Sequence, residues 1–332
     1  MSKMKKLHDD QLIVVTGGAG FIGSGVVRYL NDQGVNNIVI VDNLGHTEKW
    51  KNLVGKQFVD ILDKSQFFEW LHGRHEAIEA FIHLGACSST VETNASYLLE
   101  NNYRFSVRLA EFALKYQKRL IYASSAATYG DGSLGFVDDE KKLETLVPMN
   151  MYGYSKQLFD LWLKNEGALK KVVGLKFFNV FGPNERHKGR MASAINHVLP
   201  TARKEGVIRL FKSSAPKEFA DGEQKRDFVY VKDVARMTCA FLDNDVGGIY
   251  NIGRGVASTW NDVATAVFKA LDLPVNIQYI DMPADLIGKY QNYTCADMRK
   301  TQKVLGKDAA CMSLEDSIID YVRNYLITEK TW

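Results

Sequence analysis

The chain has 332 residues, of which 46% are hydrophobic, so it is long enough for a sizeable core and for more than one lobe. Its net charge of +3 is small for this length, which argues against a protein that binds nucleic acid through a concentrated basic face. No stretch approaches the roughly 20 apolar residues of a membrane span, so we expect no membrane partner.

The first residues do not predict a secretory signal. Residues 1–6 are basic, but Asp9 and Asp10 follow them, and the apolar run that comes next covers only residues 12–15. A secretory apolar region is longer than this. We therefore expect a cytoplasmic protein.

Neither the cysteines nor the histidines predict a metal site. The four cysteines are scattered without a Cys-x-x-Cys pair, which argues against a disulfide framework and fits a reducing compartment. His72 and His75 are more typical of a polar helix end than of a metal pair.

A glycine-rich segment after the first apolar run predicts a dinucleotide site. Residues 12–15 are typical of a buried strand, and Thr-Gly-Gly-Ala-Gly-Phe-Ile-Gly follows at residues 16–23. Glycine lets the backbone approach a pyrophosphate, and a helix beginning near Phe21 offers its N-terminal N–H groups to the phosphates. The next predicted strand, residues 38–41, ends at an acid that can bind the adenosine ribose. The expected cofactor contacts here are Gly17, Gly20, Phe21, Ile22, Gly23, Asp42 and Asn43.

The choice of nicotinamide cofactor stays open at this point. Asp42 favours the unphosphorylated ribose, whereas Lys49 is a cation shortly after the strand that could meet a 2′-phosphate. Lys49 can equally be a solvated loop charge. We expect NADP, with NAD as the alternative.

Strands and helices then alternate, which predicts an α/β fold with a doubly wound (Rossmann) parallel sheet. We expect strands at 57–59, 80–83 and 119–123 and helices at 64–71 and 97–116. Ligands of such sheets bind outside the carboxyl ends of the strands. The residues that follow the strand 80–83 are therefore further cofactor candidates: Leu84, Gly85, Ala86, Cys87 and Ser88.

The sequence Tyr-Gly-Tyr-Ser-Lys at residues 152–156 is the candidate for the chemistry. Tyr152 and Lys156 lie four apart and share a helix face. An ammonium near the phenol would favour the phenolate, and a shift of about three units would make Tyr152 a proton acceptor near neutral pH. Taken alone, the spacing is equally typical of an ordinary amphipathic helix.

Together with Ser125 at a predicted strand end, these residues resemble the extended short-chain dehydrogenase/reductase superfamily. The resemblance implies that Ser125 binds the substrate oxygen, that Tyr152 exchanges its proton, and that Lys156 holds the nicotinamide ribose and lowers the pKa of the tyrosine. Sugar dehydratases of this superfamily carry Asp-Glu directly after the hydroxyl residue. This chain has Ala126 and Ala127 there, which cannot do acid–base work, so we do not expect dehydration.

A narrower resemblance joins the chain to the ADP-L-glycero-D-manno-heptose 6-epimerases, carried by residues 86–90, 122–130, 187–189, 226–231 and 288–291. It implies inversion of C6″ of ADP-D-glycero-D-manno-heptose through a transient ketone with a tightly bound cofactor, for the inner core of lipopolysaccharide. It also implies a homo-oligomer, such as a pentamer. Another nucleotide-sugar epimerase or reductase, or a nucleotide-binding regulatory protein without catalysis, is the alternative.

The same resemblance makes Lys188 a second acid/base, on the opposite side of the substrate carbon from Tyr152. Inversion by oxidation needs hydride to leave one face of a carbon and return to the other. Once the ketone has turned over, its oxygen points away from the first base, so a second proton donor is required. A lysine can serve only when partly neutral, so we expect a lowered pKa at Lys188.

Further contacts follow from this resemblance. Lys64, Asn101 and Val180 match cofactor contacts of the family. Two departures stand out, since Leu84 occupies a position where the family often has Glu, and Arg190 one where it has Ser. The matched substrate contacts are Ser125, Asn179, Arg190, His197, Phe211, Lys212, Ser213, Ser214, Arg226 and Tyr290.

The second half of the chain predicts a smaller substrate lobe. We expect the cofactor domain at 1–180, with 228–253 returning to it, and the substrate lobe at 181–227 and 254–332. Residues 215–224 are polar and predict a surface loop. The remaining predicted elements are strands at 172–178, 229–231, 249–253 and 276–280 and helices at 232–242, 259–271 and 314–325.

Overall fold

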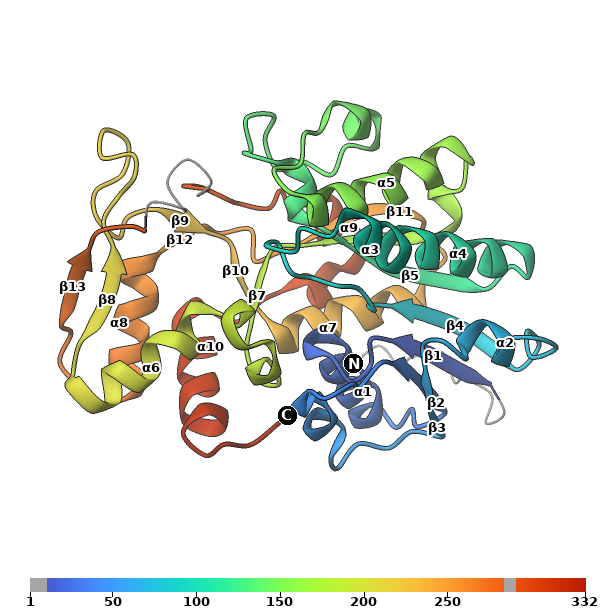
Figure 1. Ribbon diagram of the computed structural model, residues 1–332, viewed down its shortest axis with the longest axis horizontal. Helices are drawn as coiled ribbons and strands as arrows, with labels where there is room; N and C mark the ends of the chain where they lie inside the picture. Colours follow the sequence, from blue (N-terminus) through green and yellow to red (C-terminus); the bar gives the residue numbers. More distant parts are fainter. Residues whose placement is uncertain (1–10, 284–290) are drawn as a thin grey trace.

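The computed structural model describes residues 11–283 and 291–332 and is built on one seven-stranded sheet (Figure 1). The strand order is β11-β6-β5-β4-β1-β2-β3, and every neighbouring pair is parallel. The predicted doubly wound parallel sheet is thus confirmed. Its strands are β1 Leu12–Thr16, β2 Ile38–Asp42, β3 Asp60–Asp63, β4 Ile78–His83, β5 Arg119–Ser125, β6 Val173–Phe177 and β11 Gly248–Ile252.

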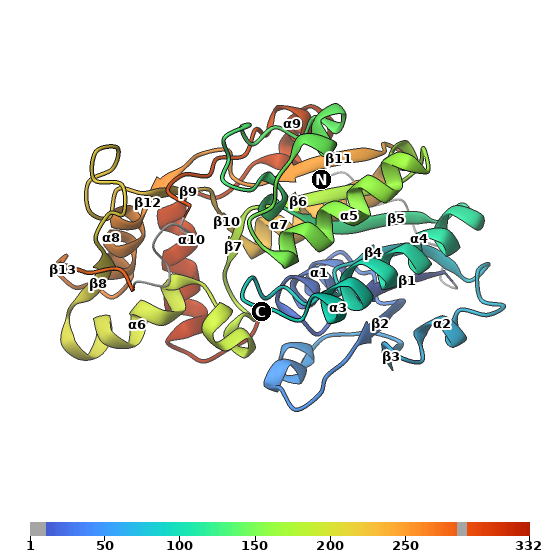
Figure 2. The same ribbon diagram turned by 45° about the horizontal axis from the view of Figure 1, so that its top comes forward.

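Helices cover both faces of this sheet (Figure 2). Strands β2, β6 and β11 are buried along their whole length because helices shield both faces of the sheet from water. Helices α1 (Phe21–Asp32) and α7 (Val231–Ala240) pack on one face. The other face carries α4 (Phe105–Lys115) and α5 (Met151–Asn165). Among the described residues, no helix is long and apolar enough to cross a membrane.

The predicted positions of two elements near the sheet edge were wrong. The strand expected at 57–59 is β3, Asp60–Asp63, which pairs with Val39–Asp42. A strand at the edge tolerates its two aspartates because one side of it faces solvent. The helix expected at 64–71 is reduced to α2, Phe67–Trp70.

The helix expected at 97–116 begins earlier and is not regular. It starts at α3, Ala95–Leu98, where the Asn94 side chain accepts a hydrogen bond from the Tyr97 N–H. A π-helical segment, Leu99–Arg104, joins α3 to α4. π-helical turns are frequent at functional sites, and this one carries Asn101.

A second lobe has its own apolar core (Figure 1). It contains α6 (Ala194–Glu205), α8 (Trp260–Ala270) and α10 (Leu314–Tyr321). The tail of the chain continues α10 as a π-helical segment, Val322–Leu326. Two small sheets complete the lobe: parallel β8 Ile208–Phe211 with β13 Ile277–Ile280, and antiparallel β9 Lys225–Arg226 with β12 Ser258–Thr259.

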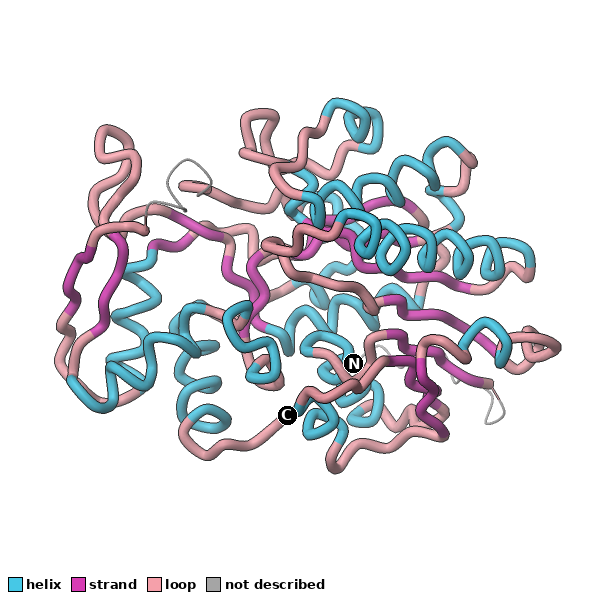
Figure 3. Tube along the Cα trace, viewed as in Figure 1, coloured by secondary structure: helices cyan, strands magenta, loops and turns pink. Residues whose placement is uncertain are grey.

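The connections between the lobes pass through β7 (Asn179–Phe181) and β10 (Phe228–Tyr230), which pair with each other in parallel. The strand predicted at 229–231 therefore lies outside the large sheet. Conversely, α9 (Arg299–Leu305) packs against the core of the large sheet, beside β11. The domain boundaries at 180, 227 and 253 stay a prediction. Figure 3 shows the segment between β8 and β9 as the loop expected at 215–224.

Candidate functional site

A cavity of about 610 Å³ opens at the carboxyl ends of β1, β4, β5 and β6. A neighbouring cavity of about 280 Å³ shares Gly17, Asp42, Lys49, Gly85 and Ala86 with it. The larger cavity is lined by Gly20, Phe21, Ile22, Gly23, Leu84, Ser88 and Val180, and the smaller one by Asn43, Lys64, Cys87 and Asn101. All of the cofactor contacts predicted from the sequence thus line these two cavities.

The glycine loop packs this closely against neighbouring backbone only because it lacks side chains. Gly17 has φ +70°, and a Cβ there would lie 2.7 Å from the backbone of Gly85 on the loop after β4. A Cβ on Gly23 would lie 2.1 Å from the carbonyl oxygen of Gly17. The loop places Gly20 and the first residues of α1 in the cavity lining, where backbone N–H groups can bind a pyrophosphate, so these residues fit a dinucleotide.

The acid at the end of β2 is paired with the lysine that follows it. The Asp42 carboxylate accepts hydrogen bonds from the N–H groups of Ala19 and Asn43, at 2.9 and 2.7 Å. Lys49 Nζ lies 2.6 Å from the same carboxylate. Nearby, Lys64 Nζ donates to the neutral side chain of Asn101 at 2.6 Å. Two cations thus border the smaller cavity at the predicted ribose position, and Asp42 neutralises one of them.

The serine, tyrosine and lysine of the predicted catalytic set meet in the larger cavity. Ser125 is the last residue of β5, and Tyr152 and Lys156 lie on α5, whose N-cap Asn150 accepts a hydrogen bond from the Gly153 N–H at 2.9 Å. The Ser125 hydroxyl lies close enough to the Tyr152 phenol to lower the pKa of that phenol. Lys156 Nζ donates to the Ala123 carbonyl at 2.8 Å.

The predicted lowering of the Tyr152 pKa by Lys156 is wrong for this structure. Burial raises the pKa of Tyr152, the nearby Ser125 hydroxyl partly offsets this, and Cys87 adds to the rise. The physical reason is desolvation, because a buried phenolate has lost its water. Burial also lowers the pKa of Lys156 to about 8, although Asp160 pulls it upward. Tyr152 is therefore the protonated partner near neutral pH.

A buried network behind Lys156 was not predicted from the sequence. Asp160, one turn further along α5, accepts hydrogen bonds from Tyr122 at 2.9 Å and from Ser124 at 2.8 Å. Lys176 on β6 completes it with an ion pair of 2.7 Å to Asp160, and both side chains are 0% exposed. The network fixes the end of β5, where Ser125 lies, against the helix that carries Lys156.

Lys188 lines the same cavity, on a different element from Tyr152 and Lys156. It lies in the 3₁₀ segment Arg186–Met191, and its ammonium is 5.4 Å from the centre of the Phe21 ring on α1. Burial lowers the pKa of Lys188, and the nearby Glu185 raises it. The expected direction of the shift is thus confirmed.

Most of the predicted substrate contacts lie outside the lining of these cavities. Asn179 and Ser125 line the larger cavity. Arg190 and His197 are exposed, Lys212 is ion-paired with Asp281, and Arg226 is buried with its guanidinium donating to the Lys225 carbonyl. Tyr290 lies outside the described residues. The predicted contacts beyond the lining are Arg190, His197, Phe211, Lys212, Ser213, Ser214 and Arg226.

Several cavity residues were not named from the sequence. Thr90 and Phe228 lie within the segments 86–90 and 226–231 that carry the family resemblance, but neither was singled out as a contact. Thr47, on the loop after β2, and Trp260, in the second lobe, belong to no motif, and only the fold brings them to the cavity. Among residues 11–283 and 291–332, no group of three His, Cys, Asp or Glu side chains could hold a metal ion.

Comparison with known proteins places this site in a family context. Residues 13–253 match the NAD dependent epimerase/dehydratase family. The ADP-L-glycero-D-manno-heptose-6-epimerase of Nitratidesulfovibrio vulgaris (strain DP4) is 51% identical over 322 residues, which are 95% of this chain and 98% of that protein.

Two solved structures agree with this. The ADP-L-glycero-D-manno-heptose-6-epimerase of Helicobacter pylori superposes with a TM-score of 0.79 at 27% identity, covering 97% of this chain and 99% of that one. MoeE5 in complex with UDP-glucuronic acid and NAD superposes with a TM-score of 0.71 at 26% identity, covering 94% of this chain and 99% of that one.

Proposed function

The chain belongs to the NAD-dependent epimerase/dehydratase family, and from this premise we propose that it is an isomerase that inverts C6″ of ADP-D-glycero-D-manno-heptose to give the ADP-L-glycero-D-manno epimer. The product would serve as a precursor of the lipopolysaccharide inner core. The observation that carries the proposal is that Tyr152 and Lys188 face one cavity from different elements, beside the glycine loop.

In this proposal, the two acid/bases divide the work between the two epimers. Ser125 holds the C6″ oxygen of one epimer, and Tyr152 takes or returns its proton. Lys188 does the same for the oxygen of the other epimer, which points away from Tyr152. Its lowered pKa makes the exchange easier, because an acid/base works best when its pKa is near the ambient pH.

We propose NADP as the cofactor held by the two cavities, with NAD as the alternative. A bound nicotinamide would accept and return the hydride, and its oxidised ring carries a positive charge that favours the phenolate of Tyr152. Lys49 and Lys64 border the smaller cavity and could meet a 2′-phosphate. Since Asp42 already neutralises Lys49, Lys64 is the stronger attraction.

The residues after Ser125 favour this reaction over dehydration. Ala126 and Ala127 begin the 3₁₀ turn that follows β5, and neither can deliver or remove a proton. A reductase that exchanges its cofactor with solution is the enzymatic rival, and it would consume reduced cofactor in proportion to product.

NMR of the purified protein with ADP-D-glycero-D-manno-heptose deuterated at C6″ tests the proposal, without added reductant. We expect the L-glycero epimer to form with its deuterium retained, because hydride leaves and returns to the same carbon. Absence of inversion, or loss of the label to water, would remove this function.

A further inference from the structure

A buried carboxylate, Glu185, holds together the loop that carries Lys188. Its Oε1 accepts hydrogen bonds from the Ser193 hydroxyl at 2.6 Å and from the Tyr321 hydroxyl of α10 at 2.9 Å. Its Oε2 accepts from the Ser193 N–H at 2.7 Å, and the Gly182 N–H points to Oε1 at 3.4 Å. One carboxylate thus joins both ends of the segment 182–193 to the second lobe.

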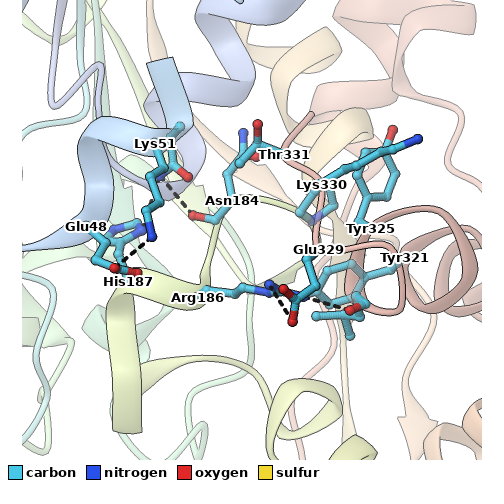
Figure 4. A pocket seen from close by; sticks show the side chains of 13 residues that line it. Glu48, Lys51, Asn184, Arg186, His187, Tyr321, Tyr325, Glu329, Lys330 and Thr331 are labelled. Atoms are coloured by element: carbon cyan, nitrogen blue, oxygen red, sulfur yellow. Dashed lines mark hydrogen bonds and ion pairs between the residues drawn. The ribbon is translucent and has the colours of Figure 1, made fainter. Parts of the chain in front are cut away.

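Asn184, the residue before Glu185, joins the same loop to the cofactor domain (Figure 4). The Asn184 side chain donates to the Ser24 hydroxyl of α1 at 3.0 Å and pairs with the backbone of Trp332. The Asn184 carbonyl accepts from the Asn52 side chain at 3.1 Å. The loop is therefore anchored on both sides of Lys188, and its position depends on residues 184 and 185.

Glu185 is also a carboxyl three residues before the lysine it positions; burial raises its pKa, and hydrogen bonds from Ser193 and Tyr321 oppose that rise. It is 1% exposed, and the Lys188 N–H donates to its carbonyl at 2.9 Å. Arg186, His187 and Arg190 are the other titratable groups on the loop, and Tyr321 faces the carboxylate from α10. Asp42 and Lys49 face His187 from the end of β2 and the turn after it. Glu185 is the carboxylate that acts on Lys188, and it favours the ammonium form.

We propose that Glu185 is a positioning residue for the second acid/base: it fixes the loop that presents Lys188 to the cavity, and its negative charge sets the pH at which Lys188 exchanges its proton. This inference rests on the proposed function. Among the described residues, the buried Glu185 carboxylate has no ion pair within 4.0 Å, so hydrogen bonds stabilise it. The proposed positioning role gives a reason for a buried carboxylate at this place.

The test is the pH dependence of kcat/KM in both directions of epimerisation. In the direction in which Lys188 gives a proton it must be charged, so the rate falls as the pH rises through its pKa. In the opposite direction Lys188 must be neutral, so the rate rises over the same pH range. Glu185→Gln removes the charge that favours the ammonium. We expect both limbs to move to lower pH, so that above the limb the direction in which Lys188 gives its proton slows roughly tenfold, while the direction in which it accepts a proton does not lose rate for this reason.

Two further variants separate charge from packing. Glu185→Asp keeps the charge and shortens the side chain, so its limbs should stay at the wild-type pH even where kcat falls. Glu329→Gln is the matched control. Glu329 is an exposed carboxylate near the end of the chain, 3.8 Å from Arg186 of the Lys188 loop. This variant should leave both pH profiles unchanged.

Failure of the inference about Glu185 can be told apart from failure of the proposed function. Lys188→Met should abolish inversion, and normal inversion by that variant would overturn the assignment of Lys188 itself. If Lys188→Met is inactive while Glu185→Gln keeps the wild-type limbs, only the inference about Glu185 is wrong. If Glu185→Gln does not fold, the Glu185→Asp variant decides. A shift of its pH limbs by as much as one pH unit would overturn the inference about Glu185.

Discussion

At the scale of single residues, the site depends on a phenol whose burial keeps it protonated. Burial raises the pKa of Tyr152, so the phenol needs a neighbouring cation before it can accept a proton. Tyr152→Phe should therefore abolish turnover, with a loss of at least about 100-fold, and leave cofactor binding intact. Epimerisation by NMR and the absorbance of copurified cofactor check this.

Tyr154→Phe is the matched control for that variant, because Tyr154 is an exposed tyrosine on the same helix. It should retain wild-type turnover. Unchanged turnover in Tyr152→Phe would mean that another group handles the proton.

Lys156 makes the stability of the protein depend on pH. Unfolded, a lysine keeps its proton up to a pKa of 10.5, whereas folded Lys156 loses it at about 8. Between these values the unfolded state binds more protons, so stability should rise with pH, by about 3 kcal/mol from this residue. Lys56 has a pKa of about 8 and contributes in the same window.

Denaturant unfolding at pH 7.5 and pH 10 measures this dependence. Lys156→Met should show a smaller rise with pH than the wild type, and Lys56→Met isolates the second contribution. An equal rise in all three proteins would contradict the account of Lys156.

The pair Asp160 and Lys176 is expected to dominate local stability. Removing one member of a fully buried ion pair leaves the other charge uncompensated, so Asp160→Asn should lower the free energy of unfolding by about 3–5 kcal/mol. The exposed pair of Lys51 and Glu48 is the comparison, since Glu48→Gln should cost less than about 1 kcal/mol. Similar losses in both variants would argue against a special role for the buried pair.

At the scale of elements, we expect Lys64, directly after β3, to discriminate between the two cofactors. Lys64→Ala should weaken NADP more than NAD, because only NADP carries a 2′-phosphate, and the loss of one charge-assisted contact corresponds to roughly tenfold in affinity. Calorimetric titration of cofactor-free protein with each dinucleotide measures this. Lys51→Ala, an exposed lysine nearby, is the control. Equal weakening of both cofactors would place Lys64 away from the 2′-phosphate.

The elements also show what the sequence could and could not predict. The strands β1, β2 and β5 and the glycine loop carry strong local patterns, and their positions were predicted closely. The π-helical segment Leu99–Arg104 and the short α2 carry no such signal, because tertiary packing determines both. The polar composition of residues 184–188 is by itself typical of a solvated loop, whereas Tyr321, distant in the sequence, helps to bury the Glu185 carboxylate.

At the scale of the whole molecule, two lobes with separate cores meet at the candidate site. The cofactor half was predictable, because its contacts follow strand ends in chain order. The substrate half was less predictable, because Trp260 belongs to no motif and reaches the cavity only through the packing of α8. The expected homo-oligomer, such as a pentamer, stays a prediction that light scattering of the full chain can test.

The central claim is that a phenol and an amine flank one carbon of the substrate. A crystal structure of the protein with its nicotinamide cofactor and ADP-heptose tests it most directly. We expect Tyr152 Oη and Lys188 Nζ on opposite sides of C6″, each within about 3 Å of a position that the C6″ oxygen occupies in one epimer. An amine of Lys188 turned toward solvent, away from the sugar, would contradict the account.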